Sequence, residues 1–375
     1  MHITFVSQDF PPETGGIQGY AHELAKRFAN QHEVTVIAPH QKGSALFDAG
    51  QPYSVVRYPI VNTSLFGLTT PASVPYISKR RGAGVAFHAQ YATALGSITA
   101  RRLGWIDRYY VAAHAREILH NNFGPLSRAA RTKVLMDASG VFAVSRYTAG
   151  LVRRLGVPAE KVHVVPNGVD LEFFYPRDTE SVRERLGLEN KRVMLSAGRL
   201  VRRKGVDTVI AAFKGMAARY PDLVFVIVGE GPYRSKLEKL AGDLVSSQRI
   251  VFTGRVSRDS LAEYYSLADF FVMPSREERG GCVEGFGLVF LEANACGTPV
   301  IGSWSGGIPD AIEHGVSGLL VPPDDVRSLE SAIVELLENN GKRLRLGKMG
   351  LERARRFTWE MCATRILAKM EIKRK

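Results

Sequence analysis

The sequence predicts an α/β protein of two domains, each built on a parallel sheet with helices on both faces. Short apolar runs such as His2–Val6 and Leu223–Val228 alternate along the chain with longer amphipathic stretches. This alternation is typical of parallel strands that are joined by crossover helices. The chain has 375 residues, which is more than one hydrophobic core usually supports, so two domains are expected.

Each half of the chain contains five predicted strands with helices between them. In the first half, strands are expected at 2–6, 33–38, 109–113, 141–144 and 162–165, and helices at 17–30, 91–102 and 146–155. In the second half, strands are expected at 193–197, 223–228, 250–252, 270–273 and 299–301. Pro176 and nearby acidic residues mark the crossing between domains, which we place at 1–170 and 171–357. A last helix is expected from 358 to about 373.

The chain is basic, and its charge is unevenly divided. The net charge is +13, and residues 1–170 hold 18 lysines and arginines against 10 aspartates and glutamates. Basic clusters occur at Lys79-Arg80-Arg81, Arg101-Arg102 and Arg153-Arg154. Such clusters suit an anionic membrane surface, although solvated loops and helix faces also carry them. No recognition helix, zinc finger or aromatic RNA-binding signature is present, so we expect no specific nucleic-acid partner.

The sequence favours a cytoplasmic protein that needs no metal. No apolar run reaches the roughly 20 residues that span a bilayer, and the first residues enter a strand without a secretory signal. Cys282, Cys296 and Cys362 lack the spacing of a zinc site or a disulfide framework. There is no Asp-x-Asp pair, and Asp324-Asp325 follows a Pro-Pro turn, where exposed acidity is the simpler interpretation.

The segment from Glu284 to Glu292 is the most informative motif. Gly285 and Gly287 leave backbone N–H groups uncovered where an apolar helix begins, and the positive end of the helix dipole suits a phosphate. Glu292 lies about two turns beyond Glu284 on a similar face, so both carboxylates could contact one polyhydroxylated ligand such as ribose or a hexose. The spacing alone also fits an ordinary helix start with one solvated glutamate.

A basic loop follows the buried strand expected at 193–197. Arg199 comes directly after this strand, and Lys204-Gly205 precedes the next helical pattern. In open parallel sheets, ligands bind at the carboxyl ends of the strands. Arg199 and Lys204 would supply a forked donor and a compact point charge for a diphosphate, and a solvated basic loop is the alternative.

Five stretches, in order and over nearly the whole chain, carry a resemblance to a known family. They are Thr14-Gly15-Gly16-Ile17, Val165-Pro166-Asn167-Gly168-Val169-Asp170, Gly198-Arg199 with Lys204-Gly205, Glu284 to Glu292, and Ser305-Gly306-Gly307-Ile308-Pro309 with Glu313-His314-Gly315. Together they resemble the retaining nucleotide-sugar glycosyltransferases of family four. The resemblance implies the GT-B fold, in which two Rossmann-like domains face a cleft and the C-terminal helix crosses back to the first domain. The loop 276–283 adds a likeness to the phosphatidylinositol mannosyltransferase branch.

The resemblance also implies a role for each residue of the second domain's motifs. Glu292 would bind the nucleotide ribose and Glu284 the hydroxyls of the transferred sugar. Arg199 and Lys204 would bind the diphosphate. Backbone N–H groups of Gly285, Phe286 and Gly287 would assist them, so that the leaving group is neutralised without a metal or other cofactor.

Further residues are implied around the base, the diphosphate and the sugar. The backbone of Arg255 and Val256 would lie against the base, although Arg255 also suits a surface charge. Gly15 and Gly16 would allow the diphosphate or the acceptor to approach closely. His114 would contact the donor sugar, whereas a lone histidine after a strand is otherwise more often structural.

The implied reaction transfers a hexosyl group from a GDP- or UDP-linked sugar to an acceptor hydroxyl with retention at the anomeric carbon. The closer likeness suggests a mannosyl group. In similar enzymes the donor phosphate takes the acceptor proton, so the protein contributes positioning and electrostatic stabilisation. We expect a lipid or glycan acceptor, with the basic first domain placed peripherally on the inner face of a membrane.

Two other functions stay open at this point. A GT-B nucleotide-sugar isomerase would share the fold, and a noncatalytic sugar-nucleotide-binding protein would share the motifs. A nicotinamide dehydrogenase is disfavoured because it needs Gly-x-Gly-x-x-Gly after the first strand, and Gly15-Gly16-Ile17-Gln18-Gly19 does not supply it.

Overall fold

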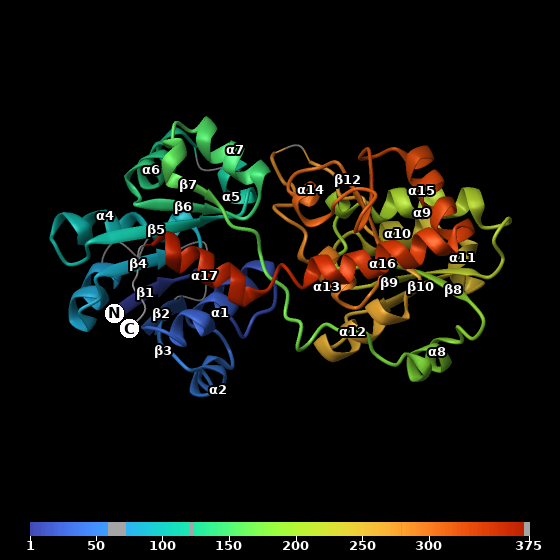
Figure 1. Ribbon diagram of the computed structural model, residues 1–375, viewed down its shortest axis with the longest axis horizontal. Coiled ribbons are helices and arrows are strands. Elements are labelled where there is room, and N and C mark those ends of the chain that lie inside the picture. The colour runs from blue at the N-terminus through green and yellow to red at the C-terminus, as the bar shows by residue number, and fades with distance from the viewer. Residues whose placement is uncertain (59–72, 120–123, 279, 371–375) are drawn as a thin grey trace. The chain divides into compact units, whose positions relative to one another are not determined.

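The computed structural model describes residues 1–58, 73–119, 124–278 and 280–370, which fall into two compact units. Unit 1 comprises Met1–Asn167 together with Trp359–Lys375, and unit 2 comprises Gly168–Thr358. Each unit is a parallel sheet that is covered by helices (Figure 1). Among the described helices, none has the length and apolar character that crossing a membrane requires.

The described strands of unit 1 form a seven-stranded sheet of order β3-β2-β1-β4-β5-β6-β7. Its strands are β1 (His2–Val6), β2 (Glu33–Pro39), β3 (Ser54–Tyr58), β4 (Val85–His88), β5 (Arg108–Ala113), β6 (Gly140–Ala143) and β7 (Val162–Val164). Its helices are α1 (Gly16–Ala29), α2 (Ser44–Ala49), α4 (Leu95–Arg102), α5 (Arg116–Leu119), α6 (Gly124–Asp137), α7 (Arg146–Arg154) and α17 (Trp359–Lys369), with 3₁₀ turns η1 (Tyr91–Thr93) and η2 (Ala159–Lys161).

Strands β3 and β4 were not predicted from the sequence, and the helix expected at 91–102 is divided. β3 is an edge strand, and none of its residues is fully buried. Its sequence accordingly has no long apolar run. β4 is only four residues long, although all four are buried. The expected helix separates into η1 and α4, and neither segment has a side-chain cap at its first turn.

The core of unit 1 is aromatic and includes the C-terminal helix. Phe5 of β1 and Phe87 of β4 stack at 5.1 Å, and Phe28 of α1 meets Phe87 edge-on at 5.4 Å. Helix α17 contacts α1, and the rings of Trp359 and Tyr20 lie 6.0 Å apart. The return of the last helix to the first domain is therefore confirmed. Its predicted last residues, 371–373, lie outside the described residues.

The described strands of unit 2 form a six-stranded sheet of order β10-β9-β8-β11-β12-β13. The strands are β8 (Arg192–Ala197), β9 (Leu223–Val228), β10 (Ile250–Gly254), β11 (Phe270–Val272), β12 (Val300–Ser303) and β13 (Gly318–Val321), of which β13 was not predicted. The helices are α8 (Glu180–Leu186), α9 (Val206–Met216), α10 (Arg234–Ala241), α11 (Asp243–Ser246), α12 (Arg258–Leu267), α13 (Leu288–Ala295), α14 (Ile308–Ala311), α15 (Val326–Glu338) and α16 (Asn340–Ala354), with the 3₁₀ turn η3 (Arg202–Lys204).

The order of each sheet identifies where a ligand crevice is expected. In unit 1 the chain winds from β1 outward to β3 and then returns to β4 on the other side of β1. In unit 2 it winds from β8 to β10 and returns to β11 on the other side of β8. Loops that leave the carboxyl ends of two such neighbouring strands diverge, which opens a crevice between them. The predicted site residues follow strands at or near these two points.

Candidate functional site

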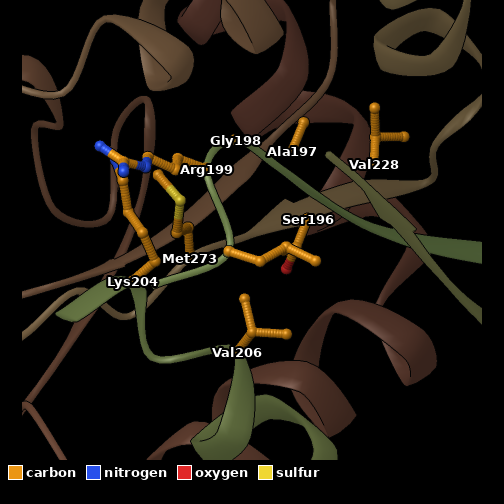
Figure 2. Close-up of a pocket in the computed structure, with 9 residues that line it drawn as sticks. Ser196, Ala197, Gly198, Arg199, Lys204, Val206, Val228 and Met273 are labelled. Atoms are coloured by element: carbon orange, nitrogen blue, oxygen red, sulfur yellow. The ribbon is translucent and has the colours of Figure 1, made fainter. Parts of the chain in front are cut away.

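A small hollow at the carboxyl end of β8 brings two of the predicted site residues together. Arg199 follows the strand, and Lys204 ends the 3₁₀ turn η3. Both side chains line the hollow, as Figure 2 shows. The complete lining is Ser196, Ala197, Gly198, Arg199, Leu200, Lys204, Val206, Val228 and Met273. The predicted pair of cations thus borders one space.

Glu284, which follows β11 at the neighbouring position of the sheet, is joined to this basic turn. Lys204 Nζ donates a hydrogen bond to Glu284 Oε2 at 2.7 Å, and Arg203 donates to the same oxygen at 2.9 Å. Burial alone would raise the pKa of Glu284, but the two cations and their hydrogen bonds outweigh it and lower the pKa to about 2. Glu284 is therefore ionised at any physiological pH.

The turn that carries Arg203 and Lys204 is fixed by close backbone packing. Gly205 follows the turn with φ of 73°, in the left-handed region that favours glycine. A Cβ atom at this position would lie 2.2 Å from the carbonyl oxygen of Pro274. Any other residue would force the turn away from the end of β11, so Gly205 explains why the basic turn lies beside Glu284.

The Gly-Gly loop after β12 supports the backbone of Glu284. Gly307 N–H donates to the carbonyl oxygen of Glu284 at 2.9 Å. Gly306 has φ of 54°, and a Cβ there would lie 2.4 Å from the same oxygen. Two of the five motifs that the sequence showed separately are therefore in direct contact, and the second positions the first.

The start of helix α13 leaves backbone donors available beside Glu284. Gly287 precedes the helix with φ of 98°, and a Cβ there would lie 2.6 Å from the ring of Phe290. Within the described residues, the N–H groups of Gly285, Phe286 and Gly287 form no backbone hydrogen bond. The side chain of Phe286 is buried, 6.2 Å from the ring of Phe357, so only its backbone could contact a ligand.

Glu292 lies on helix α13, and its environment differs from that of Glu284. Its Oε2 accepts a hydrogen bond from the Tyr265 hydroxyl of α12 at 2.9 Å. Burial raises the pKa of Glu292, and the hydrogen bond from Tyr265 opposes this only in part. Arg255 and Val256 follow β10, and the Arg255 side chain is exposed.

In unit 1, His114 follows β5 and lies in a polar cluster next to the strand-order reversal. Its Nε2 donates to the carbonyl oxygen of Ala89 at 2.9 Å, and its backbone N–H donates to Glu117 at 2.6 Å. Burial lowers the pKa of His114, although Glu117 and Asp9 pull it in the other direction. The imidazole is therefore neutral at pH 7, with Nε2 protonated.

Asp9 reaches this cluster from the loop after β1. Gln90, which follows β4, donates to Asp9 Oδ2 at 2.8 Å. Burial raises the pKa of Asp9, and the hydrogen bonds from Gln8 and Gln90 partly oppose the shift. Gly15 and Gly16 lie further along the same loop, where they are exposed at the start of α1. A Cβ at Gly16 would meet nothing within 4 Å, so this helix start is open to a ligand.

Arg203 and Tyr265 contact predicted site residues, and Arg276 contacts the turn that carries one of them, although the sequence singles out none of the three. Arg203 stands beside Lys204, and the sequence does not show which of the three consecutive cations reach Glu284. Tyr265 has no local signal, since it lies on another helix. Arg276 is buried and bonds Asp207, Thr208 and Asp324, the last at 2.7 Å. Asp324 is thus an ion-pair partner as well as an exposed turn residue.

The described residues contain no group of three or more histidine, cysteine, aspartate or glutamate side chains that could coordinate a metal ion. Cys282, Cys296 and Cys362 are free thiols. The expectation of metal-free chemistry stays a prediction.

Comparison with known proteins identifies the family. The profile described as "Glycosyltransferase Family 4" matches residues 14–173, and that described as "Glycosyl transferases group 1" matches residues 178–353. The chain is 36% identical over 357 residues, covering 93% of it and 92% of the relative, to a GDP-mannose-dependent alpha-(1-6)-phosphatidylinositol monomannoside mannosyltransferase of Mycolicibacterium smegmatis. The chain belongs to glycosyltransferase family four.

Two further relatives of this glycosyltransferase differ in their named acceptors. A monoacylated alpha-(1-6)-phosphatidylinositol monomannoside mannosyltransferase of Corynebacterium glutamicum is 32% identical over 369 residues, covering 96% of the chain and 95% of the relative. A D-inositol 3-phosphate glycosyltransferase of a Nocardioides species is 30% identical over 415 residues, covering 98% of the chain and 87% of the relative.

The solved structure of Anabaena HepE with UDP covers 99% of the glycosyltransferase chain and 100% of its own, with a TM-score of 0.83 and 22% identity. At that identity the likeness shows the GT-B fold alone. The predicted fold, family and retaining glycosyltransferase activity are confirmed. The roles of the individual site residues stay predictions.

Proposed function

We propose that this glycosyltransferase transfers a mannosyl group from GDP-mannose to a phosphatidylinositol mannoside lipid. The observation that carries this proposal is that two full-length relatives are named for the same donor and the same class of lipid acceptor. The Mycolicibacterium smegmatis and Corynebacterium glutamicum relatives, which align over more than nine-tenths of both chains, are both named as GDP-mannose-dependent mannosyltransferases of this lipid class.

The geometry of unit 2 supports the donor assignment. Arg199 and Lys204 border one hollow, and the three backbone N–H groups before α13 form no backbone hydrogen bond among the described residues. These are complementary to a diphosphate, whose negative charge grows as the glycosidic bond lengthens. Glu284, held as a carboxylate, can accept hydrogen bonds from sugar hydroxyls. Glu292, which accepts a hydrogen bond from Tyr265 through Oε2, would bind the ribose.

The chemistry that these groups can perform is electrostatic and positional. We assign no protein nucleophile, because Glu284 is paired with two cations and is proposed to bind sugar hydroxyls. In a retaining transfer of this kind, the departing diphosphate accepts the proton of the acceptor hydroxyl on the same face of the sugar. The cations of the hollow stabilise that diphosphate.

The surface of unit 1 supports a lipid acceptor. Lys79, Arg80 and Arg81 are all exposed. The Lys79 ammonium lies 4.6 Å from the centre of the Trp105 ring, which connects this cluster to the segment containing exposed Leu103. Exposed Tyr76 accepts a hydrogen bond from Arg80 at 3.2 Å. A surface that combines cations with aromatic and aliphatic side chains suits an anionic lipid interface.

The experiment that tests the function is a donor and acceptor matrix. The protein is incubated with GDP-mannose, GDP-glucose, UDP-glucose and UDP-galactose, each with phosphatidylinositol mannoside in vesicles, with inositol phosphate, and alone. We expect rapid release of nucleoside diphosphate only with GDP-mannose and the lipid, and an α-linked product. Transfer to inositol phosphate at a comparable rate would replace the lipid acceptor, and release of an isomerised sugar nucleotide would contradict the transferase assignment.

A further inference from the structure

The two cations that bind Glu284 occupy different positions relative to the hollow. Lys204 lines the hollow and also bonds Glu284 Oε2 at 2.7 Å. Arg203 bonds the same oxygen at 2.9 Å, but it is not among the residues that line the hollow in the described chain. Lys204 therefore borders both the hollow and the carboxylate, whereas Arg203 bonds the carboxylate from outside the lining of the hollow.

A diphosphate bound beside Lys204 would compete with Glu284 for its ammonium group. A phosphate group carries more negative charge than a carboxylate, and the flexible lysine stem allows the ammonium to turn toward it. Glu284 would then lose its shorter hydrogen bond while it stays largely buried, with a side chain that is 16% exposed. A buried carboxylate without a cationic partner takes up a proton or moves toward water.

Arg203 can keep Glu284 paired after Lys204 leaves, because the backbone of Arg203 is held by contacts that involve no ligand. Its carbonyl oxygen accepts a hydrogen bond from the Arg276 N–H at 2.8 Å. The Arg276 side chain is buried and forms ion pairs with Asp207 and Asp324. Gly205 fixes the other end of the same turn against Pro274. The guanidinium of Arg203 can therefore remain on Glu284 when Lys204 leaves.

Few other charges act on Glu284. The turn η3 contributes Arg203 and Lys204, which are the cations that stabilise its charge. The Gly306-Gly307 loop contacts it through backbone groups. On α13, the nearest titratable side chain along the helix is Glu292, which bonds Tyr265.

We propose that Arg203 is a positioning residue that keeps Glu284 ionised and correctly oriented while Lys204 turns to the donor diphosphate. The role of Lys204 as diphosphate ligand rests on the proposed function. Arg203 acts on the sugar only through Glu284. Its loss should therefore affect turnover more than donor binding.

The kinetic test compares Arg203→Gln with Arg202→Gln, a matched control in which the same charge is removed from the exposed neighbour in the same turn. We expect Arg203→Gln to lower kcat at least tenfold while the donor KM changes less than threefold, with partial recovery in Arg203→Lys. Arg202→Gln should stay within twofold of the parent. A raised donor KM with unchanged kcat would instead make Arg203 a donor ligand, and equal effects of both substitutions would remove it from the site.

A spectroscopic test does not depend on turnover or on the identity of the donor. The carboxyl carbon of Glu284 is followed by NMR in protein labelled at glutamate, and its signal is assigned by its loss in Glu284→Gln. Lys204→Gln imitates the departure of Lys204. We expect Glu284 to remain ionised down to pH 4 in Lys204→Gln, and to titrate above pH 4 in Lys204→Gln combined with Arg203→Gln. Ionisation down to pH 4 in the double variant would overturn the proposal.

The NMR signal of the Glu284 carboxyl carbon also shows whether Lys204 leaves Glu284 when a ligand binds. In the parent saturated with GDP, Glu284 should stay ionised down to pH 4. In Arg203→Gln with GDP, it should titrate above pH 4. Failure of the parent to bind GDP in calorimetry would contradict the proposed donor, and the comparison of the two Lys204→Gln proteins would still decide the role of Arg203.

Discussion

At the scale of single residues, the two cations that line the hollow are expected to stabilise the leaving diphosphate. Arg199→Ala or Lys204→Ala removes a charge-assisted contact that strengthens in the transition state, which is worth about 2 to 4 kcal/mol. We expect kcat/KM to fall a hundredfold or more in steady-state kinetics. Arg202→Ala is the control because Arg202 is exposed in the same turn. Rates within threefold of the parent in a folded Arg199 or Lys204 variant would place that residue outside the site.

The two glutamates should fail in different ways because their environments differ. Glu284 is held ionised by two cations, and Glu292 is bonded to Tyr265. Glu292→Ala should mainly raise the donor KM, since ribose contacts are similar in the ground and transition states, and Glu284→Ala should mainly lower kcat. Tyr265→Phe should reproduce a weaker form of the Glu292 effect. Identical changes of kcat and KM in both glutamate variants would show that the two glutamates have the same role.

At the scale of elements, the contact between the Gly306-Gly307 loop and Glu284 should be the most sensitive to a single substitution. Gly306→Ala would place a Cβ 2.4 Å from the Glu284 carbonyl oxygen, at a φ of 54°. Gly315→Ala is the matched control, since its φ is 76° and a Cβ there meets nothing within 4 Å. Both substitutions should cost roughly 1 kcal/mol of unfolding free energy for the left-handed backbone, and Gly306→Ala should cost more because its Cβ also clashes with the Glu284 carbonyl oxygen.

Only Gly306→Ala should also lower kcat, by tenfold or more, because it displaces the loop that positions Glu284. The measurements are urea unfolding and initial rates for both variants. Similar kcat values for Gly306→Ala and Gly315→Ala would show that the Gly-Gly loop does not position the carboxylate. The sequence identified this loop and the Glu284 segment as separate motifs but not their contact, because the two segments meet only through the order of β11 and β12.

At the scale of the whole molecule, the basic surface of unit 1 should recruit the protein to anionic lipid. Each cation near such a surface contributes about 1 kcal/mol, so three could raise association roughly a hundredfold at low salt and much less at 0.5 M. We expect flotation with anionic vesicles and not with neutral ones, and its loss when Lys79, Arg80 and Arg81 become Gln. Arg153→Gln with Arg154→Gln tests charge elsewhere in unit 1. Equal recovery on both vesicle types would favour a water-soluble acceptor.

Stability of unit 1 should depend on pH through a buried histidine. His88 bonds Thr93 and Ser97 at 2.8 Å each, and burial lowers its pKa from 6.5 to about 3. The unfolded chain therefore binds a proton below pH 6.5 that the folded chain does not, and unfolding becomes easier as pH falls toward 3. The loss approaches about 1.4 kcal/mol per pH unit.

Urea unfolding at pH 7.0, 6.0 and 5.0 measures this loss, and His88→Gln isolates it from other groups. Burial also lowers the pKa of His114, which adds in the same direction, whereas burial raises the pKa of Asp9 and Glu292, which acts oppositely. A parent and a His88→Gln variant with the same slope against pH would show that His88 can be protonated in the folded state.

Local features of the sequence predicted the fold class and the family correctly, and they indicated the motifs whose roles stay predictions. Apolar runs at the spacing of parallel strands and glycines next to cations or carboxylates are local features, and they predicted β1, β8 and the Glu284–Glu292 segment. Strands β3, β4 and β13 were not predicted. Strands β3 and β13 lie at sheet edges, whereas β4 is no shorter than β6 and β12, which were predicted.

The contacts between side chains from distant segments became visible only in the tertiary structure. Arg202, Arg203 and Lys204 are equivalent cations in the sequence, and only the packing of Gly205 against Pro274 directs two of them to Glu284 and leaves the third exposed. Tyr265 reaches Glu292 from another helix for the same reason. Ion pairs and hydrogen bonds depend on distances of a few ångströms between segments that are far apart in the chain, and strand order sets those distances.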